Sequence, residues 1–154
     1  MEGQDRGTQL LHGLYFDELS VGQSAEITRV VGAGDIEAFA AVSGDVNPVH
    51  LDEAYAKATP FGGRIAHGML AAAYISAVLG NKLPGPGAIY LSQSLRFRRP
   101  VKIGDQVTAR VTVKTLDAAK AHATLETLCQ VGGKTVVDSE ALIMVPQRGG
   151  NGRA

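Results

Sequence analysis

The sequence lacks several features that would point to a particular class of protein. Fifteen basic and fifteen acidic residues leave no net charge, so no global field favours nucleic acid or an anionic membrane surface as a partner. The single cysteine, Cys129, cannot form an internal disulfide. The longest apolar run, MLAAAYISAVLG, is about a dozen residues and is too short to span a bilayer. These absences favour a small-molecule partner.

The two ends of the chain are poor in structure-forming residues. The first nine residues, MEGQDRGTQ, lack the basic and apolar regions of a secretory signal, which makes the cytoplasm the default expectation. The Gly-rich and polar stretches MEGQDRGTQLLHG, which contains His12, and PQRGGNGRA are expected to fray. We therefore expect one domain over residues 1–154, with an ordered core from about residue 14 to about residue 146.

The first half of the chain alternates one strand pattern with short helical patterns. Residues 21–31 alternate apolar and polar side chains, which predicts a strand entered through Gly22. A short helix is expected next, with Asp35 as its N-cap and Gly44 at its end. A second short helix is expected from Asp52, ending before Pro60 because the residue before a proline avoids the helical region.

The rest of the chain predicts a helix and the sheet that covers it. The segment AHGMLAAAYISAVLGNK is apolar nearly all round, as is typical of an enclosed helix. After LPGPG, four strand patterns follow, and Gly132-Gly133 predicts a tight hairpin between the last two. Their inward residues alternate with polar ones. These expected inward residues are Val107, Ala109, Val111, Val113, Ala121, Ala123, Leu125, Cys129, Val131, Val137, Ala141, Ile143 and Val145. The sequence therefore predicts an α+β fold in which a curved antiparallel sheet wraps around one long helix.

The stretch VSGDVNPVHLD, residues 42–52, is the first candidate site. Pro48 interrupts a continuous helix, and Asn47 favours a turn, so we expect a loop that brings Asp45 and His50 into one cleft. A carboxylate and an imidazole that share one water molecule can move its protons. The same residues also make a good turn, with Asp45 as an Asx-turn residue and His50 as a partly buried filler. Both interpretations stay open at this point.

The stretch GGRIAHGMLAAA is the second candidate site. A glycine-rich loop runs into the start of the buried helix, so free backbone N–H groups near Gly68 could stabilise a developing oxyanion. Gly68 could instead serve only to let the helix pack tightly. His67 is expected to hydrogen-bond to backbone at the helix start. Ser76 would either bond to a backbone carbonyl or line the cleft.

The sequence resembles the MaoC-like (R)-specific enoyl-CoA hydratases, which have the hotdog fold. The matching motifs are AFAAVSGDVNPVHLD, FGGRIAHGML and LPGPGAIYLSQSLRFRRPVKIGD, and the resemblance runs from about Asp17 to Pro146. It implies that Asp45 and His50 hold the catalytic water and that Gly68 donates its amide to the thioester oxygen.

The resemblance also implies the reaction and its setting. Water adds across a trans-2-enoyl-CoA to give (R)-3-hydroxyacyl-CoA, and no metal or organic cofactor is required. In some members a serine on the central helix assists, a place that Ser76 occupies here, while Asn47 supports the loop and His67 lies beside the site. Leu79 and its neighbours would accept the acyl chain. The family is usually dimeric, so we expect a homodimer or a dimer of dimers.

Other functions remain open on the sequence alone. The same site would suit a 3-hydroxyacyl-[acyl carrier protein] dehydratase, and the fold also serves acyl-CoA thioesterases and could serve a non-catalytic acyl-CoA-binding module. The basic side chains of LRFRRPVKIGD could hold CoA phosphates, face an acidic carrier protein or form a solvated strand face. A metal site built from His50, Asp52 and His67 is conceivable, but no established ligand spacing supports it, and we expect no metal.

Overall fold

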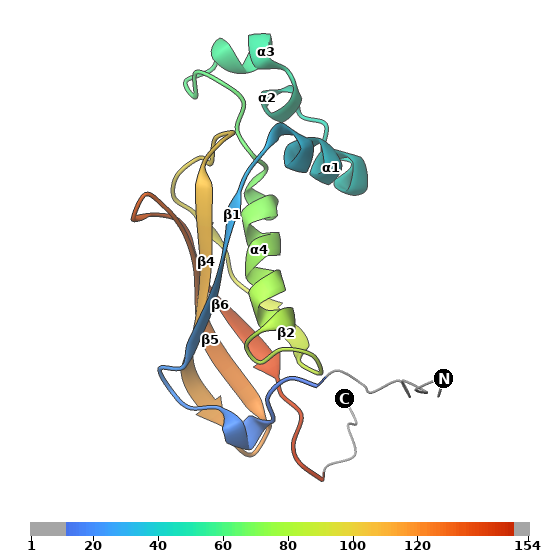
Figure 1. Cartoon of the computed structure of the whole chain (residues 1–154), viewed down its shortest axis with the longest axis vertical. Helices are drawn as coiled ribbons and strands as arrows, with labels where there is room; N and C mark the ends of the chain where they lie inside the picture. The colour runs from blue at the N-terminus through green and yellow to red at the C-terminus, as the bar shows by residue number, and fades with distance from the viewer. Residues whose placement is uncertain (1–11, 150–154) are drawn as a thin grey trace, which may run out of the picture.

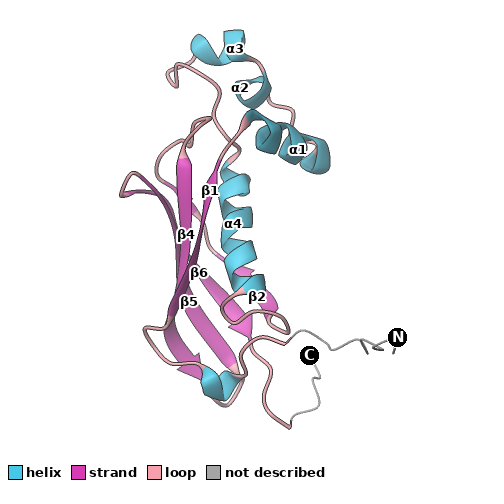
Figure 2. Cartoon of the chain, in the orientation of Figure 1, coloured by secondary structure: helices cyan, strands magenta, loops and turns pink. Residues whose placement is uncertain are grey.

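The computed structural model describes residues 12–149. Its elements are, in chain order, η1 (Phe16–Glu18), β1 (Ser24–Val30), α1 (Ala33–Ser43), α2 (Pro48–Leu51), α3 (Glu53–Lys57), α4 (Gly68–Asn81), β2 (Ile89–Gln93), β3 (Arg96–Phe97), β4 (Gln106–Asp117), β5 (His122–Val131) and β6 (Lys134–Met144). The strands form one antiparallel sheet in the order β1-β4-β5-β6-β2, and β3 also pairs with β6. Helix α4 lies along one face of this bent sheet, and α1, α2 and α3 gather at its N-terminal end (Figures 1 and 2). The predicted α+β architecture is confirmed.

The long strands β4, β5 and β6 owe their place to strict alternation of apolar and polar side chains. Val107, Ala109, Val111 and Val113 of β4 are each at most 1% exposed, as the period-2 pattern predicts. A polar residue, Thr127, interrupts the apolar face of β5, and its hydroxyl is satisfied by hydrogen bonds to Ser139 and Gln93. Helix α4 packs on the apolar face of these strands.

Cys129 belongs to this apolar face and is completely buried. Burial raises the pKa of its thiol to about 12, because the apolar surroundings disfavour the thiolate. The group is therefore a neutral, inert core residue.

The hairpin and edge strands agree with the predicted pattern except in one place. Gly132 and Gly133 both have positive φ angles, 57° and 77°, which a tight hairpin turn between β5 and β6 requires. The first of the four strand patterns after LPGPG covers residues 87–97, and the expectation that it forms one strand is wrong. It forms β2 and β3, separated by Ser94 and Leu95, and both pieces pair with β6.

Helix α4 is covered on one side only within a single chain. Its sheet-facing residues Ile75, Val78 and Leu79 are at most 2% exposed. The opposite side stays open, and Met69 is 53% exposed. The exposed residues of α4 recur at helical spacing and are Gly68, Met69, Ala73, Ser76, Gly80 and Asn81. The expectation of a fully enclosed helix is thus wrong for one chain.

The helical cap formed by α1, α2 and α3 differs from the prediction at two points. Asp35 is not the N-cap of α1, because Gly32 holds that position and the Asp35 carboxylate accepts a hydrogen bond of 2.8 Å from the Gly32 N–H. Gly44 ends α1 at a positive φ of 78°, as predicted. Residues 48–51, expected as loop, form the single turn α2, in which Pro48 is the first residue and Asn47 is the N-cap. The predicted helix after Asp52 is confirmed as α3, with Asp52 as its N-cap.

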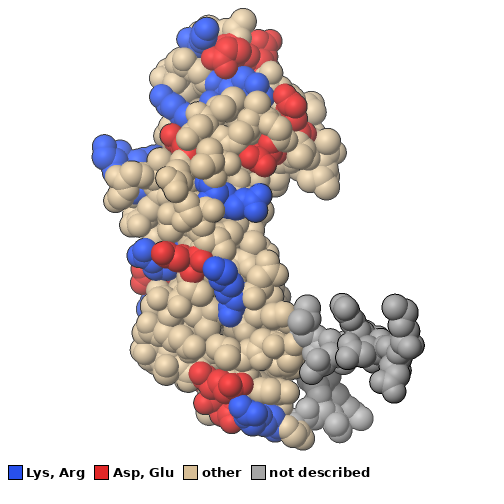
Figure 3. Space-filling view, in the orientation of Figure 1, with Lys and Arg blue, Asp and Glu red and all other residues tan. Residues whose placement is uncertain are grey.

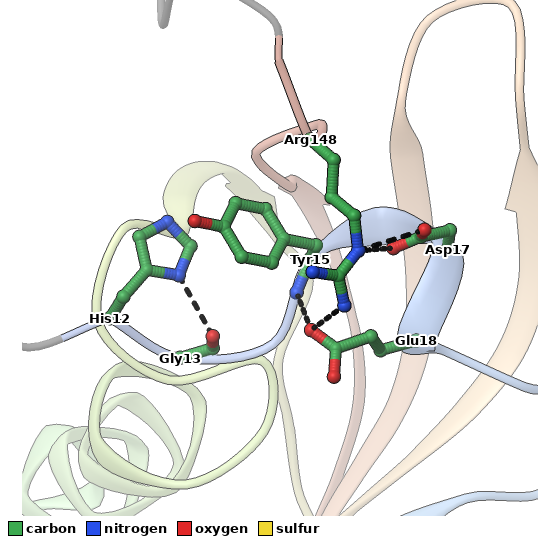
Figure 4. A network of polar contacts seen from close by, with 6 residues as sticks. All are labelled: His12, Gly13, Tyr15, Asp17, Glu18 and Arg148. Carbon is green, nitrogen blue, oxygen red and sulfur yellow. Dashed lines mark hydrogen bonds and ion pairs between the residues drawn. The ribbon is translucent and has the colours of Figure 1, made fainter.

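The two described ends of the chain contact each other at the end of the molecule that lies opposite the helical cap (Figures 1 and 4). Arg148 forms ion pairs with Asp17 and Glu18, and its guanidinium lies 4.8 Å from the centre of the Tyr15 ring. The His12 ring stacks on the Tyr15 ring, with 4.1 Å between the ring centres. His12 and Arg148, which lie in the stretches expected to fray, thus both contact Tyr15. Residues 1–11 and 150–154 lie outside the described residues.

On the side of the molecule shown in Figure 3, acidic and basic side chains are interspersed, so charges of one sign do not dominate this surface. Among residues 12–149, no helix combines the length and the apolar character that crossing a bilayer would demand.

Candidate functional site

A cleft of about 490 Å³ opens where the start of α4 meets the helical cap and β3. Its walls are largely apolar, and its polar side chains are the buried imidazoles of His50 and His67 and the guanidinium groups of Arg98 and Arg99. The lining residues are His50, Phe61, Ile65, Ala66, His67, Gly68, Met69, Ala71, Phe97, Arg98, Arg99, Pro100, Val101 and Val137. The cleft thus joins segments that are far apart in the sequence.

His50 is fixed by the backbone around it. It lies on α2 and is 8% exposed. Its Nδ1 donates a hydrogen bond of 2.8 Å to the carbonyl of Ile65, and its own carbonyl accepts one of 2.6 Å from Arg64 Nε. Because a carbonyl oxygen can only accept, Nδ1 carries the proton of the neutral ring and Nε2 presents a lone pair. This is the form of histidine that can take a proton from water.

Asp45 is held by a net of short-range hydrogen bonds in the turn after α1. Its N–H donates to Ser43 Oγ at 3.1 Å, and its Oδ1 accepts from the N–H of Asn47 at 3.2 Å. The Asx-turn interpretation of Asp45 is therefore correct, and the side chain of Asn47 caps α2 through the N–H of Val49. One carboxylate oxygen of Asp45 takes no part in these bonds and remains free for a water molecule.

His67 connects the two candidate segments. Its Nε2 donates a hydrogen bond of 2.9 Å to the carbonyl of Asp45, 22 residues earlier in the chain. Its ring stacks on that of His50 with 3.8 Å between ring centres, and on its other side it contacts Phe39 at 4.8 Å. Asp45, His50 and His67 each place one side-chain oxygen or nitrogen within 4.8 Å of the others. The two sequence stretches are thus brought to one place.

Gly68 begins α4 directly after His67, which has extended backbone angles of φ −60° and ψ 135°. The N–H of Gly68 makes no hydrogen bond within the described part of the chain, as is expected for the first residue of a helix. The ring of Phe97 packs against this glycine so closely that an added Cβ would lie 2.8 Å from a ring carbon. A free N–H at the positive end of a helix, in the wall of an apolar cleft, suits a carbonyl oxygen that gains negative charge.

The trio of Asp45, His50 and His67 is poorly arranged for a metal ion. Imidazole nitrogens bind metals along lone pairs that lie in the ring plane. The His50 and His67 rings instead stack face to face with 26° between their planes, whereas two imidazoles that share one ion direct their ring edges at it. The third member of the conceived metal set, Asp52, instead caps α3 through the N–H of Tyr55.

Four of the predicted site residues do not line this cleft, namely Asp45, Asn47, Ser76 and Leu79. Asp45 lies close to it, with a carboxylate oxygen within 4.8 Å of a nitrogen of His50 and of His67, and Asn47 caps α2. Leu79 is 2% exposed and belongs to the core under α4. Ser76 lies on the open side of α4, two turns after Gly68. Neither residue lines the cleft in one chain.

Sequence reasoning missed Phe97 as the neighbour of Gly68. Phe97 belongs to a two-residue strand, and in the sequence its only signal is an aromatic residue among basic ones.

The chain is similar to several known proteins. The family described as MaoC like domain matches residues 18–137. The (R)-specific enoyl-CoA hydratase of Rhodospirillum rubrum is 54% identical over 140 residues, which cover 91% of this chain and 96% of that protein. The 3-hydroxybutyryl-CoA dehydratase of Methylorubrum extorquens is 49% identical over 138 residues, covering 90% of this chain and 88% of that protein. The unliganded R-hydratase PhaJ1 from Pseudomonas aeruginosa superimposes with a TM-score of 0.85 at 50% identity, covering 90% of this chain and 89% of that one.

Proposed function

Because the chain belongs to the MaoC-like domain family and has its hotdog fold, we propose that it adds water reversibly to trans-2-enoyl-CoA, giving (R)-3-hydroxyacyl-CoA. The observation that carries this proposal is that His50 and Gly68, with its free N–H, line one cleft, while a carboxylate oxygen of Asp45 lies within 4.8 Å of a side-chain nitrogen of His50. The names of the relatives from Rhodospirillum rubrum and Methylorubrum extorquens support the same reaction.

In this mechanism each group has a separate task. The Gly68 N–H donates to the thioester oxygen and stabilises the enolate that forms there. The lone pair of His50 Nε2 and the free oxygen of Asp45 hold a water molecule and take its proton as the oxygen bonds to C3. The C2=C3 electron pair moves toward the thioester, and the proton taken from water returns to C2. All three atoms of water are thus in the product, as the hydroxyl on C3 and the hydrogen on C2, and no electrons leave the substrate.

The rest of the substrate would lie along the cleft and its rim. The apolar wall suits an acyl chain, and the adjacent basic strand suits the CoA phosphates. Arg98 is already paired with Asp138 at 2.6 Å, whereas Arg99 also lines the cleft and forms no ion pair in the described part of the chain. Arg99 is therefore the better candidate for a phosphate.

Two copies of the chain would complete this site. Strand β2 is an edge of the sheet, and its residues Ile89, Tyr90 and Leu91 are each about 40% exposed. The open face of α4, where Met69 and Ser76 lie, is a second exposed surface. Pairing of β2 with a second copy would satisfy the free edge and cover both surfaces. Sedimentation velocity should show a homodimer or a dimer of dimers at micromolar concentration, and a monomer under those conditions would contradict this.

Purified protein mixed with crotonyl-CoA tests the proposed reaction. We expect the absorbance of the enoyl thioester to fall without release of free thiol, and the product to be the (R)-3-hydroxy thioester by chiral analysis. Thiol release would indicate a thioesterase, and binding without loss of absorbance would indicate a non-catalytic module. Faster turnover of the crotonyl group on acyl carrier protein than on CoA would favour the dehydratase alternative.

A further inference from the structure

We infer that His67 is a positioning residue that holds the water-activating pair in a fixed relation to the Gly68 amide. The inference rests on the proposed function, since it concerns how the groups of that site are kept in register. His67 itself is not needed to touch the reacting atoms. It contacts both Asp45 and His50 and precedes Gly68 in the chain.

The first contact fixes the backbone of Asp45. The carbonyl of Asp45 accepts the hydrogen bond from His67 Nε2, while the N–H and the carboxylate of Asp45 are held within its own turn. Those turn bonds span only two residues and do not anchor the turn to the rest of the protein. Within the described residues, the His67 bond is the hydrogen bond that ties Asp45 to the start of α4.

The second contact fixes the ring of His50. The hydrogen bond from His50 Nδ1 to the Ile65 carbonyl holds the ring at one atom only, so the ring could still tilt about this bond. The parallel stack on His67, at 3.8 Å, limits that tilt and so fixes the direction of the Nε2 lone pair. His67 thereby contacts both members of the pair.

The third link is covalent. His67 is the N-cap residue of α4, and the next amide along the chain is the Gly68 N–H. The ring that orients the water-activating pair is thus attached to the peptide that carries the oxyanion donor.

The burial of His67 supports a positioning role over a solvent-exposed or proton-shuttling one. Its side chain lies between His50 and Phe39, and the residue is 3% exposed. Its second nitrogen, Nδ1, is buried without a hydrogen-bond partner among the described residues. A buried polar atom left unpaired is unfavourable. Phenylalanine would avoid that cost and also has a flat ring, so what the imidazole adds at this position is its Nε2–H.

Two substitutions separate the contributions of the hydrogen bond and of the ring. His67→Phe keeps a flat ring but removes the donor to Asp45, and His67→Gln keeps an N–H near the position of Nε2 but removes the ring. A small misplacement of reacting groups costs up to about 100-fold in rate, so we expect kcat for crotonyl-CoA to fall by about 10- to 100-fold in His67→Phe. The Gln variant should recover part of this loss. KM should change much less than kcat in both variants, because thirteen of the fourteen lining residues of the cleft are unchanged.

His122→Phe is the matched control, since it makes the same replacement at the start of β5, outside the cleft. It should keep the native kcat. Rates are referred to the folded fraction measured by circular dichroism, because a purely structural role would reduce that fraction and leave the kcat of folded molecules unchanged. Nitrogen-15 NMR of the imidazoles gives a readout that does not depend on activity, and it should find the proton of His67 on Nε2.

The outcomes are distinct. A native kcat in folded His67→Phe, with the native protein active, overturns the inference and leaves the proposed function standing. If the Phe variant does not fold, a native kcat in His67→Gln overturns it equally, because both contacts are required. A His67 proton on Nδ1 also overturns it. A native protein that does not hydrate crotonyl-CoA removes the proposed function, and the inference falls with it.

Discussion

Asp45→Asn and His50→Asn should each lower kcat for hydration of crotonyl-CoA by about 10²–10⁴-fold, the range for loss of a general acid–base group. Both changes preserve local structure. Asn at position 45 keeps an oxygen for the Asn47 N–H, and Asn at position 50 keeps an N–H near that of His50 Nδ1 for the Ile65 carbonyl. What is lost is the negative oxygen in one case and the Nε2 lone pair in the other. Initial rates at saturating substrate measure the effect.

Asp52→Asn is the control for the same chemical change. Asp52 lies seven residues after Asp45 and caps α3, and it is not part of the cluster of Asp45, His50 and His67. Asparagine is an equally good N-cap, so this variant should keep both its stability and its kcat. Folded Asp45→Asn and His50→Asn proteins with native rates would show that these residues serve only the turn and the core.

Gly68→Pro should lower kcat by about 10²–10³-fold, because proline removes the N–H that receives the thioester oxygen. The fold can accept this residue. Gly68 is the first residue of α4, where proline is favoured, and its N–H has no partner among the described residues. His67, the residue before it, already has the extended conformation that precedes proline.

Gly68→Ala separates the loss of the N–H from the added bulk. Alanine keeps the N–H but brings the same Cβ within 2.8 Å of the Phe97 ring, which is 54% exposed and can shift. We expect the alanine variant to lose much less activity than the proline variant. Equal kcat values in the two variants would mean that the amide plays no part and that the glycine only provides space.

The strands could be predicted from the sequence because alternation is a local signal. Val107 to Val113 in β4 face the core at every second position, and the two glycines at 132 and 133 allow only a tight turn. The split between β2 and β3 was missed, since the pattern of apolar residues continues across the irregular Ser94 and Leu95.

The helical cap shows where local rules compete. Pro48 was interpreted as a helix breaker, but a proline is also favoured as the first residue of a helix, and Asn47 before it is a good cap. Asp35 has the chemistry of an N-cap, yet it lies at the third position of α1 and bonds back to Gly32. Which of two neighbouring residues begins a helix depends on backbone angles that the sequence pattern does not determine.

The candidate residues could be found from motifs, but their contacts could not. The His67 bond to Asp45 spans 22 residues, and the Phe97 ring reaches Gly68 from a strand 29 residues later. Helix α4 was expected to be enclosed because it is apolar all round, and one chain covers only its sheet side. A pattern of apolar residues does not distinguish burial within one chain from burial by a second copy.

A crystal structure with bound butyryl-CoA would show how the thioester lies in the cleft, because this saturated thioester cannot be hydrated and stays in place. We expect its thioester oxygen to accept a hydrogen bond from the Gly68 N–H, with C3 facing Asp45 and His50. A thioester bound away from the Gly68 amide, or with C3 turned from that pair, would contradict the proposed mechanism.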